Sequence, residues 1–273
     1  MITVLVFGDI FGKPGRMAVK AALPDLIATH QPDFILGNAE NLAGGRGVNR
    51  KVYNEMRQMG FHGLTTGNHV WDNKDILNFI DQEERLLRPA NLPSPGDMKC
   101  PGRGASMIHN GGKSLYLINL MGRVFMDDTD CPFAKANEIL KDAPKHVPIL
   151  VDMHADATSE KYAMGWHLNG RVSAVWGTHS HVQTADERIL TGGTTAYISD
   201  IGMSGSFDSV IGLEPEPVIK KFLTRRSHGY HIAKGNPGVG CIIIKIEHNG
   251  KASSIERLRF SVNTEHLSDG DLE

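Results

Sequence analysis

The sequence is poor in cysteine and has no long apolar run. Its three cysteines, Cys100, Cys131 and Cys241, lie far apart among 273 residues and show no Cys-x-x-Cys spacing. This pattern argues against a disulfide framework or a thiolate zinc site. The first apolar run, residues 2–7, is too short for a signal peptide or a membrane span, and no basic leader precedes it. We therefore expect a cytoplasmic protein that makes no membrane contact.

An excess of positive charge is also missing. Lys and Arg number 29 against 31 Asp and Glu, which gives a net charge of -2 at pH 7. Binding to duplex nucleic acid is driven by basic surfaces, so we do not expect it here. A chain of this length buries about three quarters of its unfolded surface and needs no metal for stability. Any metal would therefore serve function.

Short apolar runs alternate with helix-like segments along the chain. The pattern predicts strands over 2–7, 33–37, 63–66, 147–153, 172–176 and 195–199, and helices over 16–29, 49–59, 74–80, 132–141, 159–167 and 215–223. Such alternation is typical of an α/β protein with a largely parallel sheet. Asn110-Gly111-Gly112-Lys113 predicts an antiparallel hairpin between 105–109 and 114–119, and 240–247 and 254–260 resemble a closing strand pair. The sheet should therefore be mixed.

The domain organisation is predicted to be simple. The chain has no internal repeat, no low-complexity tract and no linker-like stretch. We expect a single domain over 1–262, followed by a polar, acidic tail over 263–273.

Polar residues follow five of the predicted strands. They are Gly8-Asp9, Asn38-Ala39-Glu40-Asn41, Gly67-Asn68-His69, Asp152-Met153-His154 and Gly177-Thr178-His179-Ser180-His181. The carboxyl ends of strands in open α/β sheets meet in one crevice, so these groups should lie close together. His179 and His181, two residues apart in a segment expected to be extended, should face the same side.

Each piece alone has a simpler explanation. Asp9 is suited to cap a helix, Gly67-Asn68-His69 to form a turn, and a lone His154 to make a structural hydrogen bond. The nine histidines outside these strand ends are interpreted as structural. Only the complete set indicates a functional site.

The set contains more ligands than one tetrahedral zinc requires, which favours two metal ions. Its members are Asp9, Glu40, Asn41, Asn68, His154, His179 and His181. Carboxylate, amide and imidazole groups without thiolate suit Fe, Mn, Zn or Co equally. Glu40 is the candidate bridge between ions about 3.5–4 Å apart, the spacing of two-metal hydrolases.

These strand-end motifs resemble those of the calcineurin-like metallophosphoesterases. The sequence differs from the superfamily pattern in three places. Phe11 stands where a ligand histidine normally follows the first aspartate, Glu40 replaces the usual bridging aspartate, and Gly-Thr-His replaces Gly-His. The differences point to a subfamily. Together with Arg88-Pro89-Ala90-Asn91 and the segments 154–161 and 178–186, the motifs resemble the bacterial YmdB-like cyclic-nucleotide phosphodiesterases over almost the whole chain.

The resemblance implies a fold, a ligand set and an acid. The fold would be a four-layer α-β-β-α sandwich of two mixed sheets flanked by helices. One metal, with iron the family's choice, would be held by Asp9, Glu40, Asn41 and His181, and a second by Glu40, Asn68, His154 and His179. His69 would donate a proton. Asp156 and Met121 stand where the family has Glu and Gln, which affects substrate details.

The expected activity is phosphodiester hydrolysis. Two metal ions lower the pKa of a water between them and so supply a hydroxide nucleophile, while an imidazolium protonates the leaving oxygen. Asp72 could orient His69, and Arg46 and Arg123 are candidate phosphate contacts. The family resemblance implies conversion of 2',3'-cyclic nucleotides to 3'-nucleotides, with slower action on 3',5'-cyclic ones. The partner is thus a small cyclic nucleotide, and a homo-oligomer is left open.

Two alternatives remain at this point. The same site would suit a phosphomonoesterase or protein phosphatase. A metal- and nucleotide-binding regulatory protein with little turnover is the other.

Overall fold

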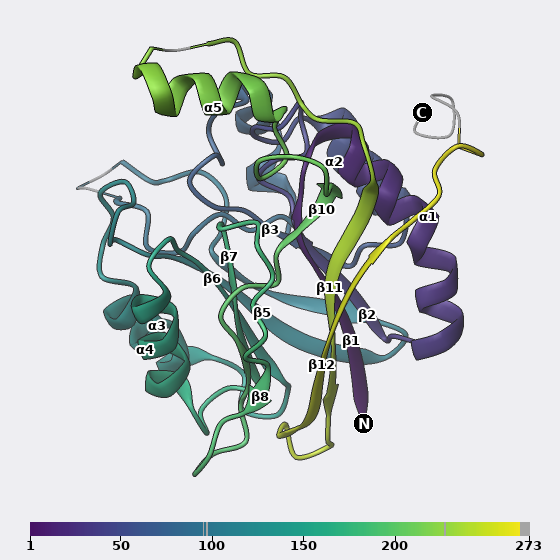
Figure 1. Ribbon diagram of the computed structural model, residues 1–273. Helices are drawn as coiled ribbons and strands as arrows, with labels where there is room; N and C mark the ends of the chain where they lie inside the picture. The colour runs from purple at the N-terminus through teal and green to yellow at the C-terminus, as the bar shows by residue number, and fades with distance from the viewer. Residues whose placement is uncertain (95, 97, 227, 268–273) are drawn as a thin grey trace.

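Two six-stranded sheets form the centre of the protein (Figure 1). The computed structural model describes residues 1–94, 96, 98–226 and 228–267. Sheet 1 contains, in spatial order, β12 (Ala252–Ser261), β11 (Pro237–Ile246), β10 (Met203–Ser206), β1 (Ile2–Ile10), β2 (Phe34–Asn38) and β3 (Gly63–Thr65). Sheet 2 contains β4 (Ala105–Asn110), β5 (Lys113–Met121), β6 (Ile149–His154), β7 (Ala174–Thr178), β9 (Ala196–Ile198) and β8 (Arg188–Ile189).

Both sheets are mixed, as predicted. Strands β1, β2, β3 and β10 run parallel, whereas β11 and β12 are antiparallel to their neighbours. In sheet 2, β5, β6, β7 and β9 are parallel, and β4 and β8 lie antiparallel at the edges. The predicted hairpin is confirmed: Gly111 and Gly112 both have positive φ, at 53° and 78°, which a tight two-residue turn requires.

Helices cover the outer faces of the two sheets. The five α-helices are α1 (Gly12–His30), α2 (Arg50–Gln58), α3 (Pro132–Asp142), α4 (Thr158–Leu168) and α5 (Pro215–Thr224). In Figure 1 the strands stand between α1 on one side and α3 and α4 on the other. The expected α-β-β-α sandwich is therefore confirmed.

The alternation of β1 explains the layers. Leu5 and Phe7 pack in a core shared with α1 and α2, whereas Val4 and Val6 pack in a second core between the sheets. A third core joins sheet 2 to α3 and α4. Because successive side chains of a strand point to opposite faces, a continuously apolar β1 can bury both of its faces.

Several local predictions were wrong in detail. Strand β1 continues to Ile10, so that Asp9 lies within the strand, with a register shift between Phe7 and Asp9. Helix α1 begins at Gly12, ahead of the predicted start, since its Pro14 lies in the first turn, where no backbone donor is required. The helix predicted over 74–80 is two short 3-10 helices, Lys74–Asn78 and Ile80–Gln82.

Two predictions concern the domain boundary and membrane contact. The division into one domain over 1–262 and a tail over 263–273 stays a prediction, and residues 268–273 of that tail lie outside the described residues. Among the residues that the structure describes, no helix is long and apolar enough to cross a membrane.

Candidate metal centre

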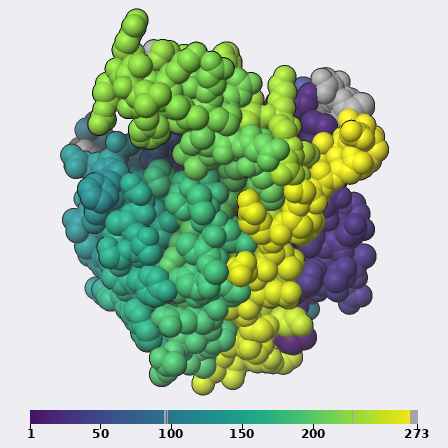
Figure 2. Space-filling model, in the orientation of Figure 1, coloured from purple at the N-terminus to yellow at the C-terminus, as the bar shows by residue number. Residues whose placement is uncertain are grey.

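The predicted site residues meet at the carboxyl ends of the strands, at the upper end of Figure 1. Sheet 1 supplies Asp9 from β1, Glu40 and Asn41 after β2, and Asn68 and His69 after β3. Sheet 2 supplies His154, the last residue of β6, and His179 and His181 after β7. Figure 2 shows that the molecular surface is recessed beneath α5 at this same end. The convergence that the sequence predicted is therefore present, but it joins two sheets.

One group of ligand atoms surrounds the Nε2 atom of His154. This nitrogen lies 2.9 Å from Asn68 Oδ1, 3.2 Å from Glu40 Oε2 and 3.1 Å from His179 Nδ1. His154 and Glu40 are 0% and 1% exposed. Four electron-donating atoms thus converge, two from buried residues and two from the partly buried Asn68 and His179.

The hydrogen bonds of His154 define which of its nitrogens carries the proton. Thr178 Oγ1 donates to Asp152 Oδ1 at 2.7 Å, so it can accept a hydrogen bond from the N–H of His154 Nδ1, 2.9 Å away. His154 Nε2 then presents a lone pair to the oxygens of Asn68 and Glu40. Lone pairs that face one another in a buried space are stabilised by a proton or a metal cation between them.

A second group contains Asp9, Glu40 and His181. Ligand atoms of these three lie within 4.8 Å of one another, as do those of Glu40, His154 and His179. His181 Nδ1 donates to the carbonyl oxygen of Ile211 at 2.9 Å, which leaves Nε2 as an acceptor 3.7 Å from Asp9 Oδ1. Asp9 Oδ1 is buried and has no hydrogen-bond partner among the residues that the structure describes. Glu40 belongs to both groups, as a bridging carboxylate would.

Asn41 completes this second group. Its Nδ2 donates to Glu40 Oε1 at 3.1 Å and lies 3.2 Å from His181 Nε2. Turning the amide by 180° would present its oxygen to the same space, the orientation that a metal ligand requires.

The electrostatics of both groups show the effect of burial. Burial and the charge of Asp200 raise the pKa of Asp9 to about 8, and burial with the charge of Asp9 raises the pKa of Glu40 well above its usual value. Burial lowers the pKa of His154, and lowers that of His179 to about 4. Crowded carboxyl groups beside neutral imidazoles are suited to divalent cations, which relieve the repulsion between the carboxylates. The residues therefore fit a metal centre.

His69 borders the groups but is more accessible. Its side chain is 24% exposed, its Nδ1 lies 2.8 Å from Asp72 Oδ2, and its Nε2 lies 3.4 Å from Asn68 Nδ2. Asp72 therefore holds a proton on Nδ1 and orients the ring. Arg46 Nη1 lies 3.7 Å from the same Asp72 oxygen.

The segment that carries His179 and His181 is not extended, so the predicted backbone conformation was wrong, although both rings point into groups that share Glu40. The two residues have φ values of 96° and 63°, in the left-handed region. Such conformations cost about 1–3 kcal/mol each in non-glycine residues. This backbone directs His179 toward His154 and His181 toward Asp9, so that each group of ligands receives one imidazole.

Sequence analysis missed the residues that support the ligands. Asp152 accepts hydrogen bonds from Thr65, Thr178 and Asn38, and thereby anchors the group behind His154. Asp200 follows β9, the same polar-after-strand signal that identified the ligands, and could have been found in that way.

A family model described as YmdB-like protein matches residues 5–258. The chain belongs to the YmdB-like family. This YmdB-like chain is 44% identical over 266 residues to the 2',3'-cyclic-nucleotide 2'-phosphodiesterase of Bacillus subtilis, and the match covers 97% of this chain and 98% of that one.

Two solved structures share the fold of this YmdB-like protein. A hypothetical protein from Thermus thermophilus aligns with a TM-score of 0.89 at 37% identity, over 96% of this chain and 100% of that one. A novel phosphatase from Mycoplasma pneumoniae aligns with a TM-score of 0.89 at 31% identity, over 100% and 99%. The fold and the family inferred from the motifs are thus both confirmed.

Proposed function

We propose that the protein is a metal-dependent phosphodiesterase that converts 2',3'-cyclic nucleotides to 3'-nucleotides, with 3',5'-cyclic nucleotides as slower substrates. The observation that carries the proposal is the pair of buried ligand groups that share Glu40, with His69 at their border. The activity named for the Bacillus subtilis relative supports the choice of substrate.

The proposed ligand sets are the two that the family resemblance implies. One ion would be held by Asp9, Glu40, Asn41 and His181, and the other by Glu40, Asn68, His154 and His179; iron is the first candidate, with Mn, Zn and Co as alternatives. Bound ions would neutralise the phosphate and activate a water molecule.

The chain itself contributes the acid. His69 is proposed to act as an imidazolium that donates the proton on Nε2 to the departing 2' oxygen and becomes neutral, because its ring is accessible and Asp72 accepts the hydrogen bond of the opposite nitrogen. Glu40 accepts the backbone N–H of His69 at 3.2 Å, so the same carboxyl group that belongs to both ligand groups also positions the acid.

Metal and product analysis tests the proposal. Protein purified without chelator should contain metal by plasma mass spectrometry and should convert 2',3'-cyclic AMP to 3'-AMP, with loss of activity in EDTA and recovery with added metal. Release of 2'-AMP, or unchanged activity in EDTA, would contradict it.

A phosphomonoesterase is the second candidate, because the Mycoplasma pneumoniae structure is described as a phosphatase. Rates on bis-p-nitrophenyl phosphate and p-nitrophenyl phosphate separate the two activities. We expect the diester to be preferred, and a strong preference for the monoester would favour the second candidate.

A further inference from the structure

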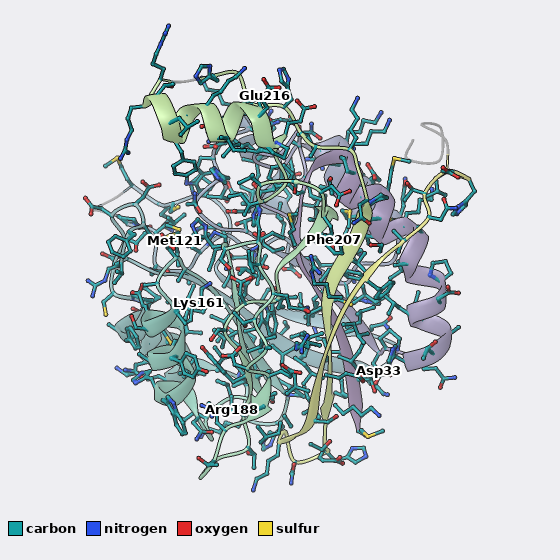
Figure 3. The ribbon with its side chains drawn as sticks, in the orientation of Figure 1. Asp33, Met121, Lys161, Arg188, Phe207 and Glu216 are labelled. Atoms are coloured by element: carbon teal, nitrogen blue, oxygen red, sulfur yellow. The ribbon has the colours of Figure 1, made fainter. Side chains whose placement is uncertain are left out.

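A buried ion pair lies beside the metal centre and is not part of the proposed ligand set. Lys161 Nζ lies 2.7 Å from Asp200 Oδ2, and the two side chains are 3% and 1% exposed. Lys161 is on α4, between that helix and the strands of sheet 2 (Figure 3). Asp200 follows β9. Burying two charges has a large desolvation cost, so an ion pair is a poor choice if filling space is all that is needed.

The carboxylate of Asp200 binds two backbone segments, one after β7 and one after β9. Its Oδ2 accepts the N–H of Ser180 at 3.1 Å, and its Oδ1 accepts the N–H of Gly202 at 2.7 Å. Its own backbone N–H and carbonyl both bond to Thr184. One carboxylate oxygen therefore holds the segment that carries the two histidines, and the other holds the backbone that follows Asp200.

That segment needs to be fixed. Ser180 lies between His179 and His181, and both histidines have left-handed backbone conformations that residues other than glycine rarely adopt. Such conformations persist only when the surroundings determine them. The N–H of His179 is held by Asp9 Oδ2, and that of Ser180 by Asp200.

Lys161 packs against the end of β7, from which the same segment continues. The stem of Lys161 passes Gly177, where an added Cβ would lie 2.7 Å from Lys161 Cδ and would overlap the carbonyl oxygen of Ser199. Glycine at this position therefore lets the backbone of Ser199 and the stem of Lys161 lie close to β7. The strand end, the lysine stem and the carboxylate thus form one packed unit.

We propose that Lys161 and Asp200 are positioning residues that set the backbone of 179–181 and thereby direct one imidazole into each ligand group. Neither residue contacts substrate in this proposal. The inference rests on the proposed function in that the two groups hold metal.

The test compares Asp200→Asn, Lys161→Met and the double variant with wild type. The side chain of asparagine has one oxygen and cannot replace both hydrogen bonds that Asp200 accepts, from the N–H of Ser180 and from that of Gly202. The double variant still removes this carboxylate but leaves no buried charge unpaired. Glu55→Gln is the matched control, because Glu55 forms a 2.8 Å ion pair with Arg16 that is almost as buried and lies between α1 and α2. The measurements are the Mn²⁺ dissociation constant by calorimetry, the visible spectrum of the Co²⁺-loaded protein, and the melting temperature in EDTA.

We expect all three site variants to bind Mn²⁺ about 10–100-fold more weakly and to show an altered Co²⁺ spectrum. The double variant should melt above Lys161→Met, because removing both charges avoids an unpaired buried one. Glu55→Gln should lower the melting temperature and leave Mn²⁺ binding unchanged.

A double variant that binds Mn²⁺ as wild type does would overturn the inference, as would an equal loss of binding in Glu55→Gln. Wild-type protein that binds no metal would instead overturn the proposed function, so the two failures are distinguishable.

Discussion

Thr178 shows how a single hydroxyl group can decide the chemistry of a ligand. Because Thr178 Oγ1 donates to Asp152, it accepts from His154 Nδ1 and leaves Nε2 free to face the acidic group. Without this hydroxyl, either nitrogen of His154 could carry the proton, and only one of the two tautomers could bind a metal.

Replacing Thr178 with valine should therefore weaken metal binding. We expect the Mn²⁺ dissociation constant of Thr178→Val to rise about 10–100-fold, measured by calorimetry. Thr195→Val is the matched control, since Thr195 is equally buried but bonds to the carbonyl of Val172, remote from the ligands. Equal weakening in both variants would show that the hydroxyl of Thr178 has no specific role.

Removing the ring of His69 should affect rate and leave metal content intact. His69→Ala loses the proposed acid, so kcat on 2',3'-cyclic AMP should fall about 100- to 10,000-fold. Metal per chain, measured by plasma mass spectrometry, should stay at the wild-type value because no ligand is removed. Loss of metal in this variant would instead identify His69 as a ligand, and undiminished turnover would exclude it as the acid.

At the scale of residues, the sequence predicted which residues gather at the site but not the backbone conformation that orients them. Asp9, Glu40 and His154 were predicted from polar residues after apolar runs, a local signal. The left-handed backbone of His179 and His181 depends on Asp9 and Asp200, which are distant along the chain. No local pattern contains that information.

Among the elements, the turn after β3 packs directly against two of the proposed ligands. Gly67 has no side chain, and a Cβ there would overlap the ring of His154 and Glu40 Oε2. Strand β3 can therefore approach β6 only with glycine at this point.

Gly67→Ala should disrupt the centre. The added methyl group must displace Glu40 or His154, so we expect loss of most metal binding and of at least about 100-fold in activity, by analogy with misplacement of supporting groups. Gly229→Ala is a suitable control, because no atom lies within 4 Å of a Cβ at that position. Wild-type metal binding in Gly67→Ala would contradict the geometry described above.

Elements with strong periodicity were predicted well, and short polar ones were not. The predicted hairpin and the helices over 132–141 and 215–223 match α3, α5 and the β4–β5 pair to within one or two residues. Strands β8 and β10 were missed. Strand β8 has only two residues, and β10, with the sequence Met203-Ser204-Gly205-Ser206, shows no apolar pattern. Their strand character arises from pairing with neighbours, a tertiary effect.

For the whole molecule, the buried carboxyl groups link stability to pH and metal. In metal-free protein, Asp9 has a pKa of about 8 against a usual value near 4, so the folded state binds more protons between these values. Its contribution to stability therefore falls as pH rises through this window. The lowered pKa values of His154 and His179 act at the other end and reduce stability below about pH 6.5.

Metal should offset the loss at high pH. With free Mn²⁺ held at one concentration, about 100 times its dissociation constant at pH 8, we expect the melting temperature to exceed that in EDTA by about 5–10 °C at pH 8 and by less at pH 5.5, where protons compete with the metal for the same groups. Differential scanning calorimetry at both pH values measures this. A larger difference at pH 5.5 would mean that the ligands are not the groups whose pKa values burial has shifted.

The ligands are divided between the two sheets, and neither sheet alone offers either group complete. A cation at this edge would therefore cross-link the two layers, in addition to the apolar side chains and the hydrogen bonds of Asp152 that already join them, comparable to a disulfide across a β-sandwich. Chelation would release that cross-link and leave this end of the sandwich less stable, while the opposite end, where β1 begins, would be unaffected.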